Sequence, residues 1–282
     1  MLIDTHTYLD AAEFTKDLDD ALLRAKQADV QCIVTVGRDL ESSRKAVQLA
    51  ERYPQVYASV GIHPNRANQE REDFLLELEQ LLKHPKVVAI GAVGLDYSRL
   101  TSKQENDEVI EGAFGAADFH TIEAEIRDEA ELAAQSSTFE QQLELAAPTG
   151  KGVVIHQCDA WEDTIELLRK YSARTRAVMH GFDGGPDRAE ELLDLAHFIS
   201  FTGNVAFKKA SELQKAVKLV RIDRIMVESG APYSASAATR NRRNELAFVR
   251  ETAEFIAALR GMSLAAFSAQ TAQNAQQFFT MS

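Results

Sequence analysis

Short apolar runs alternate with longer amphipathic stretches along most of the chain. The short runs are rich in Val and Ile, as expected of strands buried on both faces, and the stretches between them have the period of helices. The pattern predicts strands at Leu2–Thr5, Cys32–Val36, Tyr57–Gly61, Val87–Val93, Gly152–His156, Ala177–His180, Phe198–Thr202 and Arg224–Glu228. It predicts helices at Leu18–Ala28, Leu40–Tyr53, Phe74–Lys83, Trp161–Tyr171, Pro186–Ala196, Ser211–Leu219 and Glu245–Leu259.

Eight strand–helix units predict an α/β fold of the (β/α)8 TIM-barrel type, because an open doubly wound sheet usually has fewer strands. A length of 282 residues suits one barrel, so we expect a single domain spanning residues 1–282. Only the segment 101–138 breaks the alternation, and its second half, Ile122–Ala134, has the pattern of an acidic helix. We expect a solvated insertion on the barrel rim, with a contact surface for a protein partner as the alternative.

Most of the net charge of −12 falls in this insertion. The insertion contains ten acidic residues and two basic ones, Lys103 and Arg127, so its net charge is −8. The rest of the chain carries a net charge of −4. Such a chain is not a general nucleic-acid binder, since phosphate backbones favour clustered Lys and Arg, but a local basic site remains possible. The apolar runs are too short to span a membrane, and the N-terminus MLIDTH lacks a secretory pattern. We therefore expect a cytoplasmic protein with no membrane segment.

In barrels of this type, functional side chains lie at the carboxyl ends of the strands. One histidine that ends a strand is more often structural than a ligand. Four imidazoles that converge on one mouth, however, suit a transition metal or a phosphate oxygen. The histidines in this position are His6, His63, His156 and His180, and Glu228 ends the eighth strand. The remaining three, expected at the surface, are His84, His120 and His197.

Ordered motifs along nearly the whole chain resemble those of the TatD family, metal-dependent nucleases of the amidohydrolase superfamily. The motifs are IDTH, VGIHPN, AIGAVGLDY, VVIHQCDAW, VMHGF, ISFTGNVAFKKA, VESGAPY, RRNELAFV and TAQNAQQFF. The resemblance implies metal-dependent hydrolysis of phosphodiester bonds in DNA. It implies metal ligands at His6, His156 and His180, with His63 and Glu228 in catalytic roles.

Half of the six ligand positions that the resemblance implies carry other residues. The family has His where this chain has Tyr8, a bridging Glu where it has Ala92, and Asp where it has Gly230. The Arg that follows the fifth-strand His in the family falls at Gln157-Cys158. A two-metal site without carboxylates loses its anionic ligands, whereas three His can hold one zinc ion.

Two carboxylates could replace the missing ones. Glu228 precedes Gly230 by two residues, hence on the same strand face about 7 Å deeper, and Asp183 follows His180. The sequence therefore predicts at most one divalent metal ion, zinc-like, or none. Replacing Tyr8 with His, Ala92 with Glu and Gly230 with Asp together is expected to rebuild the six-ligand set.

Basic residues that follow the seventh and eighth strands are candidates for phosphate binding, with a solvated surface as the alternative. They are Lys208, Lys209, Arg240, Arg242 and Arg243. A phosphate-bearing ligand or DNA is the expected partner.

The substitutions favour a TatD-like protein with impaired or lost nuclease activity, a pseudoenzyme in the extreme case. An active hydrolase with an atypical one-metal site is the alternative. Other chemistry on the same scaffold also stays open, because fold does not fix function.

Overall fold

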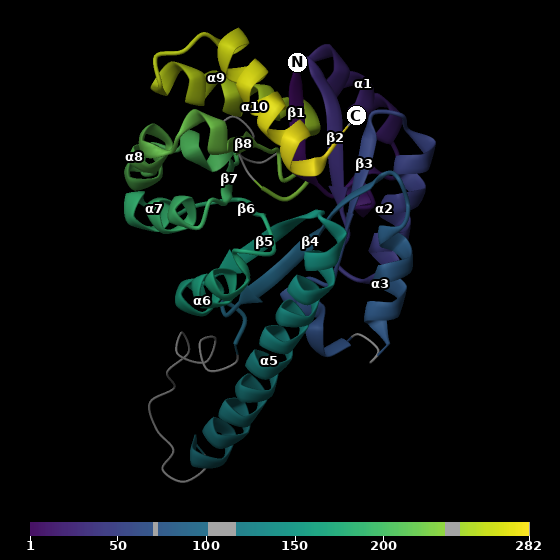
Figure 1. Ribbon diagram of the computed structural model, residues 1–282, viewed down its shortest axis with the longest axis vertical. Coiled ribbons are helices and arrows are strands. Elements are labelled where there is room, and N and C mark those ends of the chain that lie inside the picture. Colours follow the sequence, from purple (N-terminus) through teal and green to yellow (C-terminus); the bar gives the residue numbers. More distant parts are fainter. Residues whose placement is uncertain (70–72, 101–116, 235–242, 282) are drawn as a thin grey trace.

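Eight parallel strands, adjacent in the order of the sequence, form a nearly closed barrel that alternates with helices (Figure 1). The computed structural model describes residues 1–69, 73–100, 117–234 and 243–281, with 117–125 described by their backbone alone. The strands are β1 (Leu2–Thr7), β2 (Val30–Val36), β3 (Val56–Val60), β4 (Val87–Asp96), β5 (Gly152–Cys158), β6 (Ala177–Met179), β7 (Phe198–Phe201) and β8 (Ile225–Val227). The predicted barrel and its eight strands are confirmed.

The first and last strands meet at the carboxyl end of the barrel. The N–H of Gly230 donates to the carbonyl of His6 at 3.0 Å, and the N–H of Tyr8 donates to the carbonyl of Ala231 at 2.8 Å. Thr5 Oγ1 adds a bond to the carbonyl of Val227 at 3.0 Å. The segment after β8 is therefore held against β1, which places Glu228 beside His6.

The helices cover the outside of the sheet, and all seven predicted helices are present. They are α1 (Leu18–Gln27), α2 (Leu40–Arg52), α3 (Phe74–Leu82), α6 (Trp161–Tyr171), α7 (Pro186–Asp194), α8 (Ser211–Leu219) and α9 (Val249–Leu259). The last one begins four residues later than predicted, after the 3-10 turn η7 (Leu246–Phe248). The sequence reading missed α10 (Leu264–Phe279). None of the described helices has the length and apolar character that crossing a membrane would require.

Helix α10 packs aromatic side chains against the amino end of the barrel. The ring of Phe278 lies 5.3 Å from that of Phe198, the first residue of β7, and 4.8 Å from that of Phe279. Gly152 begins β5 under the same ring, where a β-carbon would lie 2.4 Å from Phe278. Only glycine allows this close approach. His197, expected at the surface, is buried at the same end with 1% exposure.

The acidic insertion differs most from the prediction. From Ala117 to Ala146 the chain forms one helix, α5, which begins before and ends after the predicted segment Ile122–Ala134. Its amino-terminal half extends beyond the barrel (Figure 1), whereas its second half is packed against β4 and the 3-10 helix η2 (Pro64–Gln69). Gln135 and Gln142 are 2% and 0% exposed. The expected solvated insertion is therefore wrong for this half of the helix. Residues 101–116 lie outside the described residues.

Candidate active site

The four predicted histidines lie together at the carboxyl end of the barrel. All four line one cavity of about 580 Å³. His6 comes from β1, His63 follows β3, His156 belongs to β5 and His180 follows β6. The alternation of strand and loop explains this convergence, since the carboxyl ends of parallel strands in a barrel face the same side.

Three of the side chains form a group that could hold a metal ion. His6, His180 and Glu228 each offer a ligand atom, and these atoms lie within 4.8 Å of one another. The rings of His6 and His180 are stacked 3.9 Å apart at an angle of 9°. Glu228 is 1% exposed, and its Oε1 lies 3.3 Å from His180 Nδ1. The carboxylate that could replace a missing one is therefore Glu228, while Asp183 is exposed and outside the group.

His156 has other neighbours. Its Nε2 lies 3.1 Å from Asp96 Oδ2, and its Nδ1 lies 3.2 Å from His180 Nε2. Sequence reasoning named His156 as the third ligand, whereas the structure places Glu228 in that group and sets His156 between Asp96 and His180. Metal binding by His156 stays a prediction that would require a change of its partners.

Counting protons along this row tests whether a cation fits. Asp96, His156, His180 and Glu228 are joined in this order by three close contacts. Each contact brings together two atoms with lone pairs, so each requires a shared proton to be a hydrogen bond. Two neutral imidazoles carry only two N–H groups. One further positive charge is therefore required, either a proton or a metal ion.

Unpartnered atoms favour the metal ion. Both ring nitrogens of His6 and the Oε2 atom of Glu228 are buried without a hydrogen-bond partner among the described residues. Leaving such atoms unpaired costs about 1–3 kcal/mol each, and more for a charged group. A proton between His180 and Glu228 would leave all three unpaired, whereas a cation could be shared by these residues. The donor set of two imidazoles and one carboxylate thus fits one divalent ion.

Burial favours the neutral form of His6, His63 and His156. It lowers the pKa of His6 and of His63 well below the ordinary value, and the nearby histidines add to the effect. Burial also lowers the pKa of His156, although the hydrogen bond to Asp96 opposes the shift. Neutral imidazole is the form that binds a metal ion.

Asp96 organises this part of the site, and sequence reasoning missed it. Its carboxylate accepts hydrogen bonds from Ser98 Oγ at 2.5 Å, from Asn65 Nδ2 at 3.2 Å and from His156. Burial alone would raise the pKa of Asp96, but the bonds from His156 and Ser98 outweigh it and hold the pKa well below its usual value. Asp96 is therefore a permanent carboxylate that orients His156.

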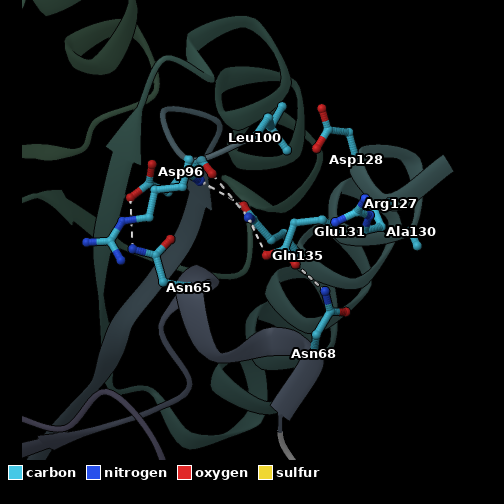
Figure 2. A pocket seen from close by; sticks show the side chains of 10 residues that line it. Asn65, Asn68, Asp96, Leu100, Arg127, Asp128, Ala130, Glu131 and Gln135 are labelled. Carbon is cyan, nitrogen blue, oxygen red and sulfur yellow. Dashed lines mark hydrogen bonds between the residues drawn. The ribbon is translucent and has the colours of Figure 1, made fainter. Parts of the chain in front are cut away.

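Two glutamines of α5 fix the strand ends beneath these groups. Gln135 accepts from the backbone N–H of Asp96 at 2.8 Å and donates to the carbonyl of Asp96 at 3.1 Å. Gln142 makes the same pair of bonds to Ile62, the residue before His63, at 2.8 and 3.1 Å. Figure 2 shows Gln135 reaching Asp96 beside Asn65. Side chains seven positions apart on one helix face thus hold the backbone next to Asp96 and His63.

The three substituted positions lie in different surroundings. Ala92 is fully buried in the apolar barrel interior. The ring of Tyr8 meets that of His6 edge to face at 5.0 Å. Gly230 has a φ of +63°, and a β-carbon there would lie 2.3 Å from Ser234 Oγ and 2.7 Å from its Cβ. Aspartate at position 230 would displace Ser234, so the triple replacement does not simply restore the six ligands.

The predicted phosphate-binding residues do not line this cavity where the structure describes them. Lys208 and Lys209 are exposed. Arg243 donates to Asp17 at 2.6 and 2.7 Å and to Glu245 at 2.8 Å, which ties the segment after β8 to α1. Arg240 and Arg242 lie outside the described residues. The basic residues that line the cavity, all missed by sequence reasoning, are Arg38, Arg66 and Arg99.

Gln157 does not take the place of the arginine that the resemblance implies. Its amide oxygen is placed to accept from the backbone N–H groups of Asp159, Ala160 and Trp161 at 2.9 to 3.2 Å. Gln157 therefore caps the start of α6. The thiol of Cys158 is held neutral because burial raises its pKa.

Comparison with known proteins identifies the family of the chain. The family model described as TatD related DNase matches residues 3–280. The chain belongs to the TatD family. Its relatives include the uncharacterized metal-dependent hydrolase YabD of Bacillus subtilis, 32% identical with 99% of both chains covered. The 3'-5' ssDNA/RNA exonuclease TatD of Edwardsiella piscicida is 30% identical, with 99% of this chain and all of that protein covered.

Solved structures show the same fold. YJJV, a TatD homolog from Escherichia coli, has a TM-score of 0.84 at 24% identity and covers all of this chain and 98% of its own. A TatD family protein from Entamoeba histolytica has a TM-score of 0.78 at 22% identity, with 98% and 97% covered. This TatD-family chain therefore has the barrel fold of its relatives, and it departs from the pattern that the resemblance implies at Tyr8, Ala92 and Gly230.

Proposed function

We propose that this TatD-family protein hydrolyses phosphodiester bonds with a single divalent metal ion held by His6, His180 and Glu228. The observation that carries the proposal is a group of two imidazoles and one carboxylate whose ligand atoms lie within 4.8 Å of one another. Both ring nitrogens of His6 and the Oε2 atom of Glu228 lack a hydrogen-bond partner among the described residues. Such nitrogen and oxygen ligands suit zinc. The bound ion would act as a Lewis acid toward a phosphoryl oxygen.

The protein's own residues would hold and orient the substrate. The backbone N–H of Asn65 donates to His63 Nδ1 at 3.2 Å, so the neutral ring carries its proton on Nε2. His63 is then a hydrogen-bond donor to a substrate oxygen rather than a base. His156, oriented by Asp96, remains within reach of the same cavity.

The proposed substrate class is single-stranded DNA or RNA, because the Edwardsiella piscicida relative is a 3'-5' ssDNA/RNA exonuclease. Ala92 and Gly230 offer no carboxylate for a second ion, so cleavage should be slow compared with that relative assayed under the same conditions. A protein that binds metal but cleaves neither polymer would instead be a binding protein that keeps the fold.

The test measures metal content and cleavage together. Glu228→Gln removes the anionic ligand with little change in shape and should lower metal affinity and cleavage by about two orders of magnitude. Asp183→Asn, an exposed carboxylate beyond the same strand ends, is the matched control and should change neither. Metal content unchanged in Glu228→Gln would contradict the proposed ligand group. Two ions per chain would show that another carboxylate completes a two-metal site.

A further inference from the structure

Several arginine side chains gather at the cavity above the proposed metal group. Arg38, Arg66 and Arg99 line it, and Asp96 is the only carboxylate among the described lining residues. That carboxylate is already used by His156, Ser98 and Asn65. In a chain whose net charge is −12, a cavity with three arginines is an exception to be explained.

The arginines come from three consecutive loops on one side of the mouth. Arg38 follows β2, Arg66 belongs to η2 after β3, and Arg99 follows β4. The Arg38 guanidinium carbon lies 5.1 Å from the centre of the Tyr8 ring, and its Nη2 donates to Asp10 at 3.1 Å. Arg66 donates to Gln69 at 2.7 Å, its Nε lies 3.8 Å from Asp39 Oδ2, and its side chain is 49% exposed.

Electrostatics place these charges next to the histidines. Burial is the main cause that lowers the pKa of His63, and the positive charge of Arg38 adds to it. For His156, burial again dominates, and Arg99 contributes in the same direction. Two of the arginines are therefore close enough to the imidazoles for their charges to be felt at the proposed reaction centre.

We infer that Arg38, Arg66 and Arg99 bind the phosphate groups of the substrate on the β2–β4 side of the mouth, beside the metal group, whose residues come from the ends of β1, β6 and β8. Guanidinium groups bind phosphate oxygens through paired N–H donors, and they remain charged at all relevant pH values. The cavity volume of about 580 Å³ is in the range of pockets that enclose a small ligand. The inference rests on the proposed function and names the residues that select a phosphate-bearing ligand.

Binding of a nucleoside 3',5'-bisphosphate tests this independently of cleavage, by calorimetry on the metal-free and the zinc-loaded protein. Arg66→Gln is the first variant because the Arg66 side chain is more exposed than that of Arg38, and Arg38→Gln and Arg99→Gln follow. Each should weaken binding about tenfold or more, the effect of losing a hydrogen bond to a charged group. Arg→Lys at the same positions should recover part of the affinity, and the unphosphorylated nucleoside should bind none of the proteins measurably.

Arg221→Gln is the matched control, since this exposed arginine precedes β8 at the opposite end of the barrel. Thermal unfolding of each variant separates loss of binding from loss of fold. Unchanged affinity in all three cavity variants, or a loss caused instead by Lys208→Gln with Lys209→Gln, would overturn the inference. If the bisphosphate binds through the arginines but the protein takes up no metal, the inference stands and the proposed function is refuted. If the protein cleaves its substrate but binding does not depend on the arginines, the proposed function stands and the inference is refuted.

Discussion

The two ends of the barrel are built from the same eight strands but hold opposite kinds of side chains. At the amino end, Phe278 of α10 packs its ring against Phe198, and the ring of Phe279 packs against that of Phe278. At the carboxyl end, imidazoles and carboxylates face one another, and among the described residues the ring nitrogens of His6 and the Oε2 atom of Glu228 have no hydrogen-bond partner. The difference shows that stability and chemistry are separated along the strand axis, so each end should respond to substitution in its own way.

The largest expected effect is at the closed end. Phe278→Ala should lower the free energy of unfolding by about 3–5 kcal/mol, because it removes a fully buried ring and leaves a cavity beside Gly152. Urea denaturation measures the loss, with Leu219→Ala, an exposed leucine of α8, as control. Metal content per folded molecule should not change. If metal affinity fell with stability, the two ends would be coupled and the comparison would fail.

Gln135→Met tests whether α5 supports the open end as well as the fold. It removes both hydrogen bonds to the Asp96 backbone while conserving the side-chain length, and should cost about 2–3 kcal/mol. Because Asp96 orients His156, kcat should fall more than KM changes, and the ring resonances of His156 in NMR spectra should shift. Gln141→Met removes a bond within the same helix, from Gln141 to Ser137, and should leave both unchanged. A loss of stability with kcat and the His156 resonances intact would limit Gln135 to holding the fold.

The smallest expected effect concerns acid stability and again belongs to the closed end. Burial lowers the pKa of His197 to about 4, against about 6.5 in an unfolded chain. The unfolded chain binds more protons in this window, so the stabilisation is complete above pH 6.5 and is lost as the pH falls toward 4.

Between about pH 7.5 and pH 5, the free energy of unfolding should fall by about 2 kcal/mol less in His197→Gln than in the native protein, because the variant has no imidazole to protonate on unfolding. Urea unfolding of the zinc-loaded proteins at both pH values provides the measurement. Equal losses in the two proteins would show that other groups cause the acid sensitivity.

Much of the open end could be predicted from local pattern. His6, His63, His156 and His180 each end a strand or follow one directly, and parallel strands in a barrel bring those ends together whatever the detail of the loops. The same reasoning allowed Glu228 as a replacement carboxylate but could not choose it over Asp183. Its place beside His6 depends on the backbone bonds between Gly230 and His6, which join residues 224 positions apart.

The sequence by itself determined the eight strands, the seven predicted helices and the histidines of the mouth, because hydrophobic period and strand ends are local properties of the chain. Only the tertiary structure decided which groups meet across the mouth. Gln135 binds the backbone of Asp96 from 39 residues away, and Arg243, a predicted phosphate ligand, is paired with Asp17 across 226 residues. Such contacts depend on how loops and helices pack in three dimensions, which a residue's immediate sequence neighbours do not encode.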